Sequence, residues 1–334
     1  MSLAVLSAPR VRRVAAVTAA AALTLLAGAC GSSEGASADQ ATDISVGSSP
    51  GLSGVGLRAG ISEGIFSDLG LNVTAAANKS ANDAVPQLLS GTLQIAQMDT
   101  VTLMQARVQG LPVRVVAGAG VQATDGEDGV PSAASVVTAA SSAIQSPTDL
   151  VDRKVGVPAI KTQTWMNIRA VVDKAGGDSS RIDFVEVPPA QTIDLVQQGY
   201  VDAATPNEPL ASSAIASGTV RLVHNTDAPG NQGVPSSVYV ASEEFIAKNP
   251  DTVRKFVEGI HQAAEIVNAD KEIAKQVAIE ELGFSEEQLA NAFIQPFATT
   301  PVTAEQLDKI ANLAVEYEIL TEKPSFDEIL VGSE

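Results

Sequence analysis

Hydroxyl, amide, ammonium and carboxylate groups follow the predicted strands of the N-terminal half, at the points where these strands end. They are Ser48, Ser49, Asn78, Lys79, Ser80, Asp99 and Thr100. The carboxyl ends of parallel strands meet at one edge of a sheet, beside helix N-termini with free N–H groups, so we expect these residues at one edge. Their chemistry is hydrogen bonding and charge pairing with a small solute. The alternative for each residue by itself is a helix cap or a turn.

A second polar set begins a predicted helix near the middle of the chain. It follows a strand predicted over residues 155–157 and comprises Lys161, Thr162, Gln163 and Thr164. A cation with hydroxyl and amide groups at a helix N-terminus could cradle an anion or a carbonyl group. Trp165, the next residue, could stack on a ligand ring or pack on the sheet.

Asn207 and Glu208 follow another predicted strand, over residues 200–203. The Glu208 carboxylate could accept a hydrogen bond from a solute, or it could form a salt bridge across the lobe. Both interpretations stay open at the level of the sequence.

The residues needed for metal or covalent chemistry are not grouped in this sequence. It contains one cysteine, Cys30, and two histidines, His224 and His261, and it lacks His-x-x-His or Glu-x-x-His spacing. No nucleophile with a neighbouring base is legible at the strand ends. We therefore predict a protein that is not an enzyme, with no catalytic residue, metal site or cofactor, and an ordinary loop position for His224.

The elements that position these residues occur twice. A helix pattern, a glycine and a strand pattern span residues 83–99, and a weaker copy begins at Gln191, with Gly199 and Ala204 each 108 residues after Gly91 and Ala96. Two further pairs of segments match in the same order, residues 46–47 with 155–156 and residues 71–73 with 182–184. Strands that alternate with helices pair in parallel, so the repeat predicts two similar α/β lobes.

The predicted lobes are joined by two crossing segments. We assign residues 43–138 and 237–334 to lobe I and residues 139–236 to lobe II, because a return strand near Val238 and a helical end should pack on the first lobe. Two crossing strands are what a hinge requires.

Composition limits the partners. The formal net charge of -18 disfavours a polyanion, and only 4% of the residues are aromatic, so base-stacking platforms are scarce. We expect no nucleic-acid partner.

The N-terminus has the layout of an export signal. Residues 1–29 combine a basic start with an apolar run, which predicts a signal peptide, although an uncleaved anchor is an alternative. Residues 26–30 resemble the lipobox of bacterial lipoproteins, with Ala27 where leucine is most common. The resemblance implies a lipidated Cys30, a flexible tether over residues 30–42, and a position at the outer face of the cell membrane. General secretion is the default route, and Arg12-Arg13 leaves twin-arginine export open.

Several motifs together resemble a known family of transport proteins. The segments ISEGIFSDLGLNV, AVPQLLSGTLQIAQMD, LPVRVVAG, SPTDLVDRKVGVP and QQGYVDAATPNEP are similar to substrate-binding proteins of ABC importers in the nitrate, sulfonate and taurine group. This group also includes binders of thiamine-pyrimidine precursors. The resemblance runs from about Ile44 onward and implies a periplasmic-binding-protein type II fold, an α/β fold with two lobes and a two-strand hinge.

The same resemblance implies where a solute binds. The contact loops of the family fall at Ser48, Ser49, Lys79, Ser80, Asn82, Asp99, Thr100, Lys161, Thr162, Gln163, Thr164, Asn207 and Glu208. Trp165 adds a candidate for stacking. The first loop, SSPGLSGVGLRAG, departs from the aromatic or proline-rich segment that is common in the family, which leaves the solute open.

We therefore expect a monomeric, extracytoplasmic receptor that delivers a small solute to ABC permease subunits. Lys79, Lys161 and the helix N-termini favour an organic sulfonate or carboxylate. A neutral heterocycle such as a pyrimidine precursor, stacked on Trp165, is the alternative. An enzyme on the same fold and a sensor lobe for a membrane kinase are less favoured.

Overall fold

The computed structural model describes residues 41–77, 81–126 and 132–331, with the backbone alone at residues 81 and 82. The predicted signal peptide and Cys30 lie outside these residues. The chain from Gln40 to Glu334 clusters as one unit, so its two sheets are described together.

The first sheet contains four strands that run in one direction and one antiparallel strand, which lies between the third and fourth of them. Its order is β2-β1-β3-β10-β4. The strands are β1 (Thr42–Ser48), β2 (Leu71–Ala77), β3 (Ile95–Asp99), β4 (Val113–Gly118) and β10 (Ser237–Ser242). β1 is parallel to β2 and β3, whereas β10 is antiparallel to β3 and β4. The predicted return of the chain to this sheet is therefore confirmed.

The second sheet repeats this plan. Its order is β7-β6-β8-β5-β9. The strands are β5 (Ser135–Ala139), β6 (Lys154–Val157), β7 (Asp183–Glu186), β8 (Ala203–Ala204) and β9 (Val220–Asn225). β6 is parallel to β7 and β8, and β5 is antiparallel to β8 and β9. His224 lies in β9 and is fully buried, so its assignment to an ordinary loop was wrong.

Matching residues of the repeat occupy matching positions in the two sheets. Gly47 pairs with Ala96 in the first sheet, and Gly156 pairs with Ala204 in the second. A Cβ atom on Gly47 or on Gly156 would lie 3.2 Å from the Cβ atom of its alanine partner, and closer still to one further side chain. Small residues recur at these positions because the sheets leave no room for larger ones.

The strand β5 differs from the prediction. We placed residues 135–138 in lobe I, but β5 lies in the second sheet, between β8 and β9. It occupies there the position that β10 occupies in the first sheet. Each sheet thus takes in, as an antiparallel strand, the segment that has just arrived from the other sheet.

The two crossing segments run side by side. Val121 and Pro235 form an isolated antiparallel bridge. The Gln122 N–H donates to the Val234 carbonyl at 2.9 Å, and the Gly233 N–H donates to the Gln122 carbonyl at 2.8 Å. These contacts form the two-strand hinge that the sequence predicts.

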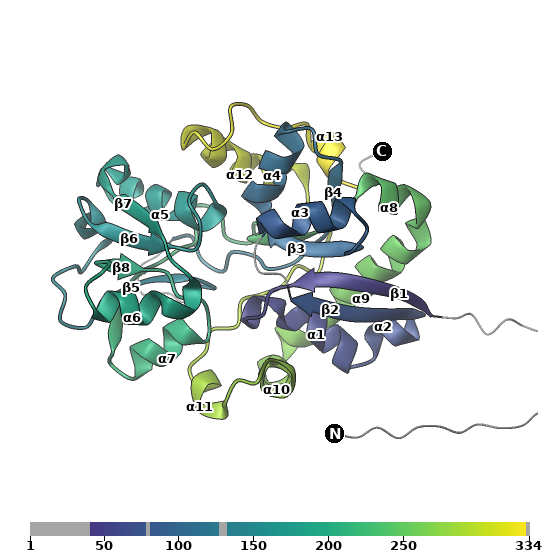
Figure 1. Cartoon of the computed structure of the whole chain (residues 1–334), viewed down its shortest axis with the longest axis horizontal. Coiled ribbons are helices and arrows are strands. Elements are labelled where there is room, and N and C mark those ends of the chain that lie inside the picture. The colour runs from purple at the N-terminus through teal and green to yellow at the C-terminus, as the bar shows by residue number, and fades with distance from the viewer. Residues whose placement is uncertain (1–40, 78–80, 127–131, 332–334) are drawn as a thin grey trace, which may run out of the picture. The chain divides into compact units, whose positions relative to one another are not determined.

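Helices cover both faces of each sheet, with α5 on one face of the second sheet and α6 and α7 on the other (Figure 1). The helices are α1 (Val55–Ser62), α2 (Ile65–Asp68), α3 (Ala81–Leu89), α4 (Thr100–Val108), α5 (Gln163–Lys174), α6 (Thr192–Gln197), α7 (Leu210–Ala216), α8 (Glu243–Lys248), α9 (Pro250–Ala269), α10 (Lys271–Leu282), α11 (Glu286–Leu289), α12 (Ala304–Glu316) and α13 (Phe326–Ile329). Short 3₁₀ turns lie at Leu52–Gly54, Pro147–Leu150, Ser179–Arg181 and Pro189–Gln191. In the described part of the chain, none of the helices combines the length and apolar character that crossing a bilayer requires.

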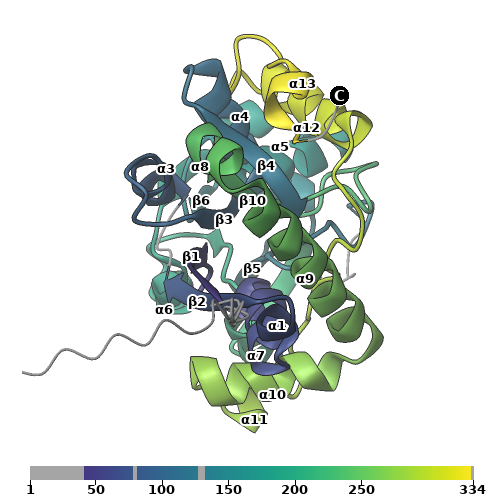
Figure 2. The same ribbon diagram turned by 90° about the vertical axis from the view of Figure 1, so that its right-hand side faces the viewer.

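The C-terminal helices pack on the first sheet, as expected from the sequence. Phe256 of α9 stacks on Phe66 at 5.7 Å between ring centroids and meets the edge of Tyr239 at 5.3 Å. Figure 2 shows α9 beside β10 and β4. Capping boxes begin α11 at Ser285 and α12 at Thr303, because each of these residues is followed three positions later by a glutamine.

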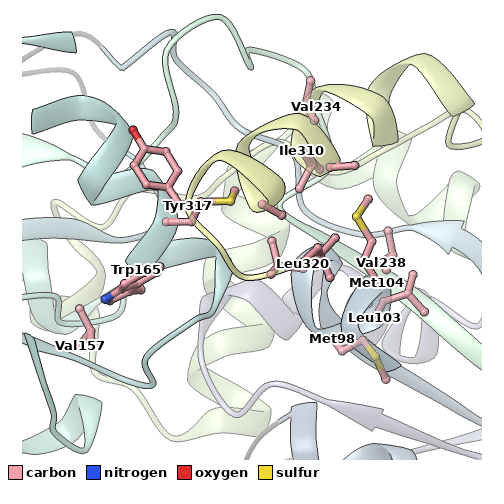
Figure 3. Close-up of a cluster of buried hydrophobic side chains, with 14 of the residues drawn as sticks. Met98, Leu103, Met104, Val157, Trp165, Val234, Val238, Ile310, Tyr317 and Leu320 are labelled. Atoms are coloured by element: carbon pink, nitrogen blue, oxygen red, sulfur yellow. The ribbon is translucent and has the colours of Figure 1, made fainter. Parts of the chain in front are cut away.

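One apolar cluster includes side chains from helices of both sheets. Met104 of α4 and Ile310 of α12 belong to it, together with Trp165 and Met166 of α5. Figure 3 shows Trp165 beside Val157, with Ile310 on α12 and Tyr317 directly after the end of that helix. This cluster joins the two halves beside the hinge, and it includes Val234 of one crossing segment.

Candidate functional site

A cavity of about 400 Å³ lies between the two sheets. Its walls come from the ends of β1 and β3, the segment before β10 and a loop after α11 on one side. The other side consists of the loops after β6 and β8 and the segment before β5. Both walls are therefore built at the strand ends, where the sequence placed the binding residues.

Seven of the predicted residues line this cavity. They are Ser49, Asp99, Thr162, Gln163, Thr164, Asn207 and Glu208. They come from the strand ends of both sheets, so residues from the two halves of the repeat lie around one cavity. Lys79 and Ser80 lie outside the described residues, as does the side chain of Asn82.

Ser48 and Thr100 lie beneath the cavity wall. Ser48 is fully buried, and its hydroxyl accepts a hydrogen bond from the Arg58 guanidinium at 3.0 Å. Thr100 is also fully buried and donates to the Pro235 carbonyl at 3.3 Å. Both side chains support the wall from beneath. Their contacts favour a structural role over a contact with solute.

Lys161 is exposed and does not line the cavity. Its backbone has a φ of 61°, in the left-handed region, within the tight turn that leads into α5. The predicted anion cradle therefore lacks the Lys161 ammonium group. Only the next three residues, Thr162, Gln163 and Thr164, line the cavity.

Trp165 also lies away from the cavity. Its side chain is 8% exposed, tilts against Phe184 at 5.7 Å and lies under the Arg169 guanidinium at 4.8 Å. The ring faces the apolar cluster because α5 turns this position toward its own sheet. Of the two roles considered for Trp165, the structure supports packing on the sheet and not stacking on a ligand.

Asp99 lies between the N-termini of two helices from different sheets. Its carboxylate accepts from the Thr102 N–H at 3.0 Å and the Thr102 hydroxyl at 2.5 Å, which caps α4. It also accepts from the Gln163 N–H of α5 at 3.4 Å. Burial raises the pKa of Asp99, whereas these hydrogen bonds oppose the rise.

Glu208 lies on the opposite wall, in the loop after β8. It is 7% exposed, and its carboxylate accepts from the Ser212 hydroxyl at 2.8 Å and, from the other half of the molecule, from the Phe293 N–H at 3.3 Å. Burial raises its pKa to about 7, although both hydrogen bonds act in the opposite direction. The sequence left two interpretations of Glu208 open, a contact with a solute and a salt bridge. Within the described residues, Glu208 forms no salt bridge.

Several lining residues were missed by the sequence reasoning. Gln97 accepts from the Ser49 N–H at 3.3 Å and donates to the Ser53 carbonyl at 2.9 Å, so it ties the first loop to β3. The sequence did offer a signal for Gln97, because it is an amide residue between apolar residues of the strand β3. Phe293 and Gln295 also line the cavity, but their loop has no periodicity that points there.

The described part of the chain contains no group of three or more His, Cys, Asp or Glu side chains placed to hold a metal ion. The polar atoms of the cavity are instead carboxylates, amides and hydroxyls. This arrangement can hold a small organic molecule by hydrogen bonds from both sheets.

A family model described as "NMT1/THI5 like" matches residues 55–274. A protein of Brucella abortus (strain 2308) named "Putative binding protein" is 25% identical over 175 residues, which are 52% of this chain and 53% of that protein. The chain thus spans about half the length of the curated relatives that it matches.

Solved structures share the fold. The periplasmic aliphatic sulphonate binding protein SsuA from Escherichia coli is 18% identical with a TM-score of 0.69, over 86% of this chain and 97% of that one. A ligand-binding component of an ABC-type import system from Staphylococcus aureus, with zinc bound, is 13% identical with a TM-score of 0.71, over 87% and 97%. At these identities the likeness shows the fold alone, and it confirms the predicted periplasmic-binding type.

Proposed function

Because the chain belongs to the NMT1/THI5-like family, we propose that it is the solute receptor of an ABC importer. The observation that carries the proposal is the cavity of about 400 Å³, whose walls come from two sheets joined by paired crossing segments. A volume of this size suits a small organic molecule.

We propose that the receptor works by closing on its solute. The two domains would follow the two sheets: one comprises residues 42–118 and 237–331, and the other comprises residues 135–225. The boundary predicted after residue 138 thus moves to a point before β5. A solute that contacts both walls binds the closed arrangement better than an open one, and this difference in affinity shifts the population. The closed form of a monomer would then be presented to membrane permease subunits. No chemical step is part of this proposal.

Export and lipidation at Cys30 complete the proposal, since a receptor tethered outside the cell could pass its solute to a permease. In cells, Cys30→Ser is expected to move the protein from the membrane fraction to the soluble fraction, because the residue that would carry the lipid is lost. Fractionation and labelling with a fatty acid measure this. Unchanged membrane attachment of the variant would contradict lipid anchoring at Cys30.

The receptor function predicts one bound solute per chain. Native mass spectrometry of the purified full chain should detect a small molecule, and a solute at 100 times its Kd should add about 2.7 kcal/mol to the free energy of unfolding. Ala159→Trp should abolish this gain, because the indole would fill space at the cavity wall. Ala140→Trp is the matched control, since Ala140 is exposed in a turn and does not line the cavity. If no anion, amine or neutral compound binds, the receptor function is refuted.

A further inference from the structure

Two carboxyl groups face the cavity from opposite walls, and no described cation pairs with them. Asp99 and Glu208 both line the cavity, and neither forms a salt bridge within the described residues. Among the described lining residues there is no lysine or arginine. Arg58 lies below the wall and donates to Ser48 and to backbone carbonyls there.

Asp99 occupies the place that an anionic solute would need. The free N–H groups at the start of a helix attract negative charge, and the N-termini of α4 and α5 meet at this point. The Asp99 carboxylate already accepts from Thr102 of α4 and from Gln163 of α5. A sulfonate or carboxylate placed beside it would meet a like charge at close range.

The carboxylates retain capacity to accept further hydrogen bonds. A carboxylate has about four acceptor positions, and each Glu208 oxygen has one donor described, from Ser212 and from Phe293. A buried carboxylate without a cation is costly, so these oxygens favour a charged donor from a solute.

Two buried amide atoms at the same cavity lack a partner. Gln163 Oε1 and Gln295 Nε2 make no hydrogen bond within the described structure, and each side chain is only 4% exposed. The other end of the Gln163 amide is fixed by donation to the Pro235 carbonyl at 3.2 Å. Unpaired buried polar atoms of this kind point to a ligand that completes them: a donor for Gln163 and an acceptor for Gln295.

We propose that the solute is a small organic cation with several N–H donors, such as a protonated amine or a guanidinium compound, which also carries one neutral acceptor. Its cationic group would lie between Asp99 and Glu208 and also donate to Gln163, and its neutral acceptor would face Gln295. This inference rests on the proposed receptor function. It replaces the organic anion expected from Lys79 and Lys161, of which Lys161 lies outside the cavity wall and Lys79 outside the described residues.

The test compares ligands of one carbon skeleton that differ in charge. Butylamine, butylguanidine, butyramide, butyrate and butanesulfonate are titrated into the full chain after removal of bound solute, with heat of binding and melting temperature as readouts. Native mass spectrometry identifies the molecule that the untreated protein retains. We expect the cationic members to bind, butyrate and butanesulfonate to give no response, and the retained molecule to be a cation.

Charge-neutral variants locate the contact. Asp99→Asn and Glu208→Gln should each weaken binding of the cation about tenfold or more, because each replaces a charge-assisted hydrogen bond by a neutral one. Asp183→Asn, at an exposed position of β7, is the matched control and should leave Kd unchanged. Circular dichroism reports whether the variants fold, and the ligand series on the unmodified chain decides the question even if they do not.

The outcomes separate the two proposals. Binding of butyrate or butanesulfonate without binding of the amines, or a retained anion, would overturn the cationic solute and leave the receptor function intact. Equal affinity of the cation for the unmodified chain and for both variants would also overturn it. If the series gives no response and no small molecule is retained, the receptor function itself fails.

Discussion

Replacing Glu208 by glutamine should make the stability of the solute-free protein less sensitive to pH. Glu208 is buried at the cavity wall, and burial raises its pKa from 4.5 to about 7. The Ser212 hydroxyl can rotate to accept from a glutamine amide, so the substitution removes the titration while keeping the hydrogen bonds with limited change.

The sign follows from proton linkage. Between pH 4.5 and about 7 the folded protein holds a proton on Glu208 that the unfolded chain has released, so the free energy of unfolding decreases as the pH rises. The whole shift corresponds to at most about 3 to 4 kcal/mol of stability, which is present below the unfolded pKa and lost above the folded one. Glutamine has no such loss, so the variant should gain stability relative to the unmodified protein as the pH rises.

Urea unfolding at several pH values between 4 and 8 measures this difference, with Glu63→Gln at an exposed position as the control. Burial also raises the pKa of Asp99, but Asp99 is present in both proteins. Its contribution to the pH dependence of stability therefore largely cancels when the two proteins are compared. The helix α11 packs against α7, which begins two residues after Glu208. Its charged groups are Glu286 and Glu287, which are exposed and are the same in both proteins. If the difference between Glu208→Gln and the unmodified protein is flat across this range, burial does not raise this pKa and the reasoning fails.

Two further substitutions test the packing. Tyr317→Phe removes the hydrogen bond from the Tyr317 hydroxyl, directly after α12, to Asp173 Oδ2 of α5 at 2.9 Å, and should cost about 1 kcal/mol in urea unfolding. Tyr200→Phe, at an exposed ring, should cost nothing measurable. Equal effects of the two substitutions would show that the contact between Tyr317 and α5 adds no stability. Phe256→Ala removes a fully buried ring that stacks on Phe66 and should cost about 3 to 5 kcal/mol, measured as a lower urea midpoint. A loss below about 1 kcal/mol would contradict the described packing of α9 on the first sheet.

The repeat was readable because its causes are local. Alternation of strand and helix patterns fixes parallel pairing, and the glycines at positions 47 and 156 recur where a side chain would collide with Ala96 or Ala204. These patterns also predicted that polar residues from both halves meet at the strand ends. Seven of the predicted residues do line one cavity.

The sequence misplaced elements whose partners are distant. β5 follows the first half of the chain directly, so adjacency suggested the first lobe, but its backbone groups pair with β8 and β9. The prediction of side-chain directions around the start of α5 was wrong for a similar reason. Lys161 and Trp165 lie on either side of residues that reach the cavity, and only the fixed direction of α5 against its sheet decides which side chains point inward.

By itself, the sequence determined the two α/β lobes, the crossing strands between them and the edge where a solute could bind, because periodicity and turn residues act over short stretches. Only the tertiary structure decided the charge of the site. It brings Asp99 to the N-termini of two helices, sets Glu208 on the facing wall, and adds Gln295 from a loop with no pattern of its own. The field in a cavity depends on which groups are buried together, and that is a property of packing between segments far apart in the chain.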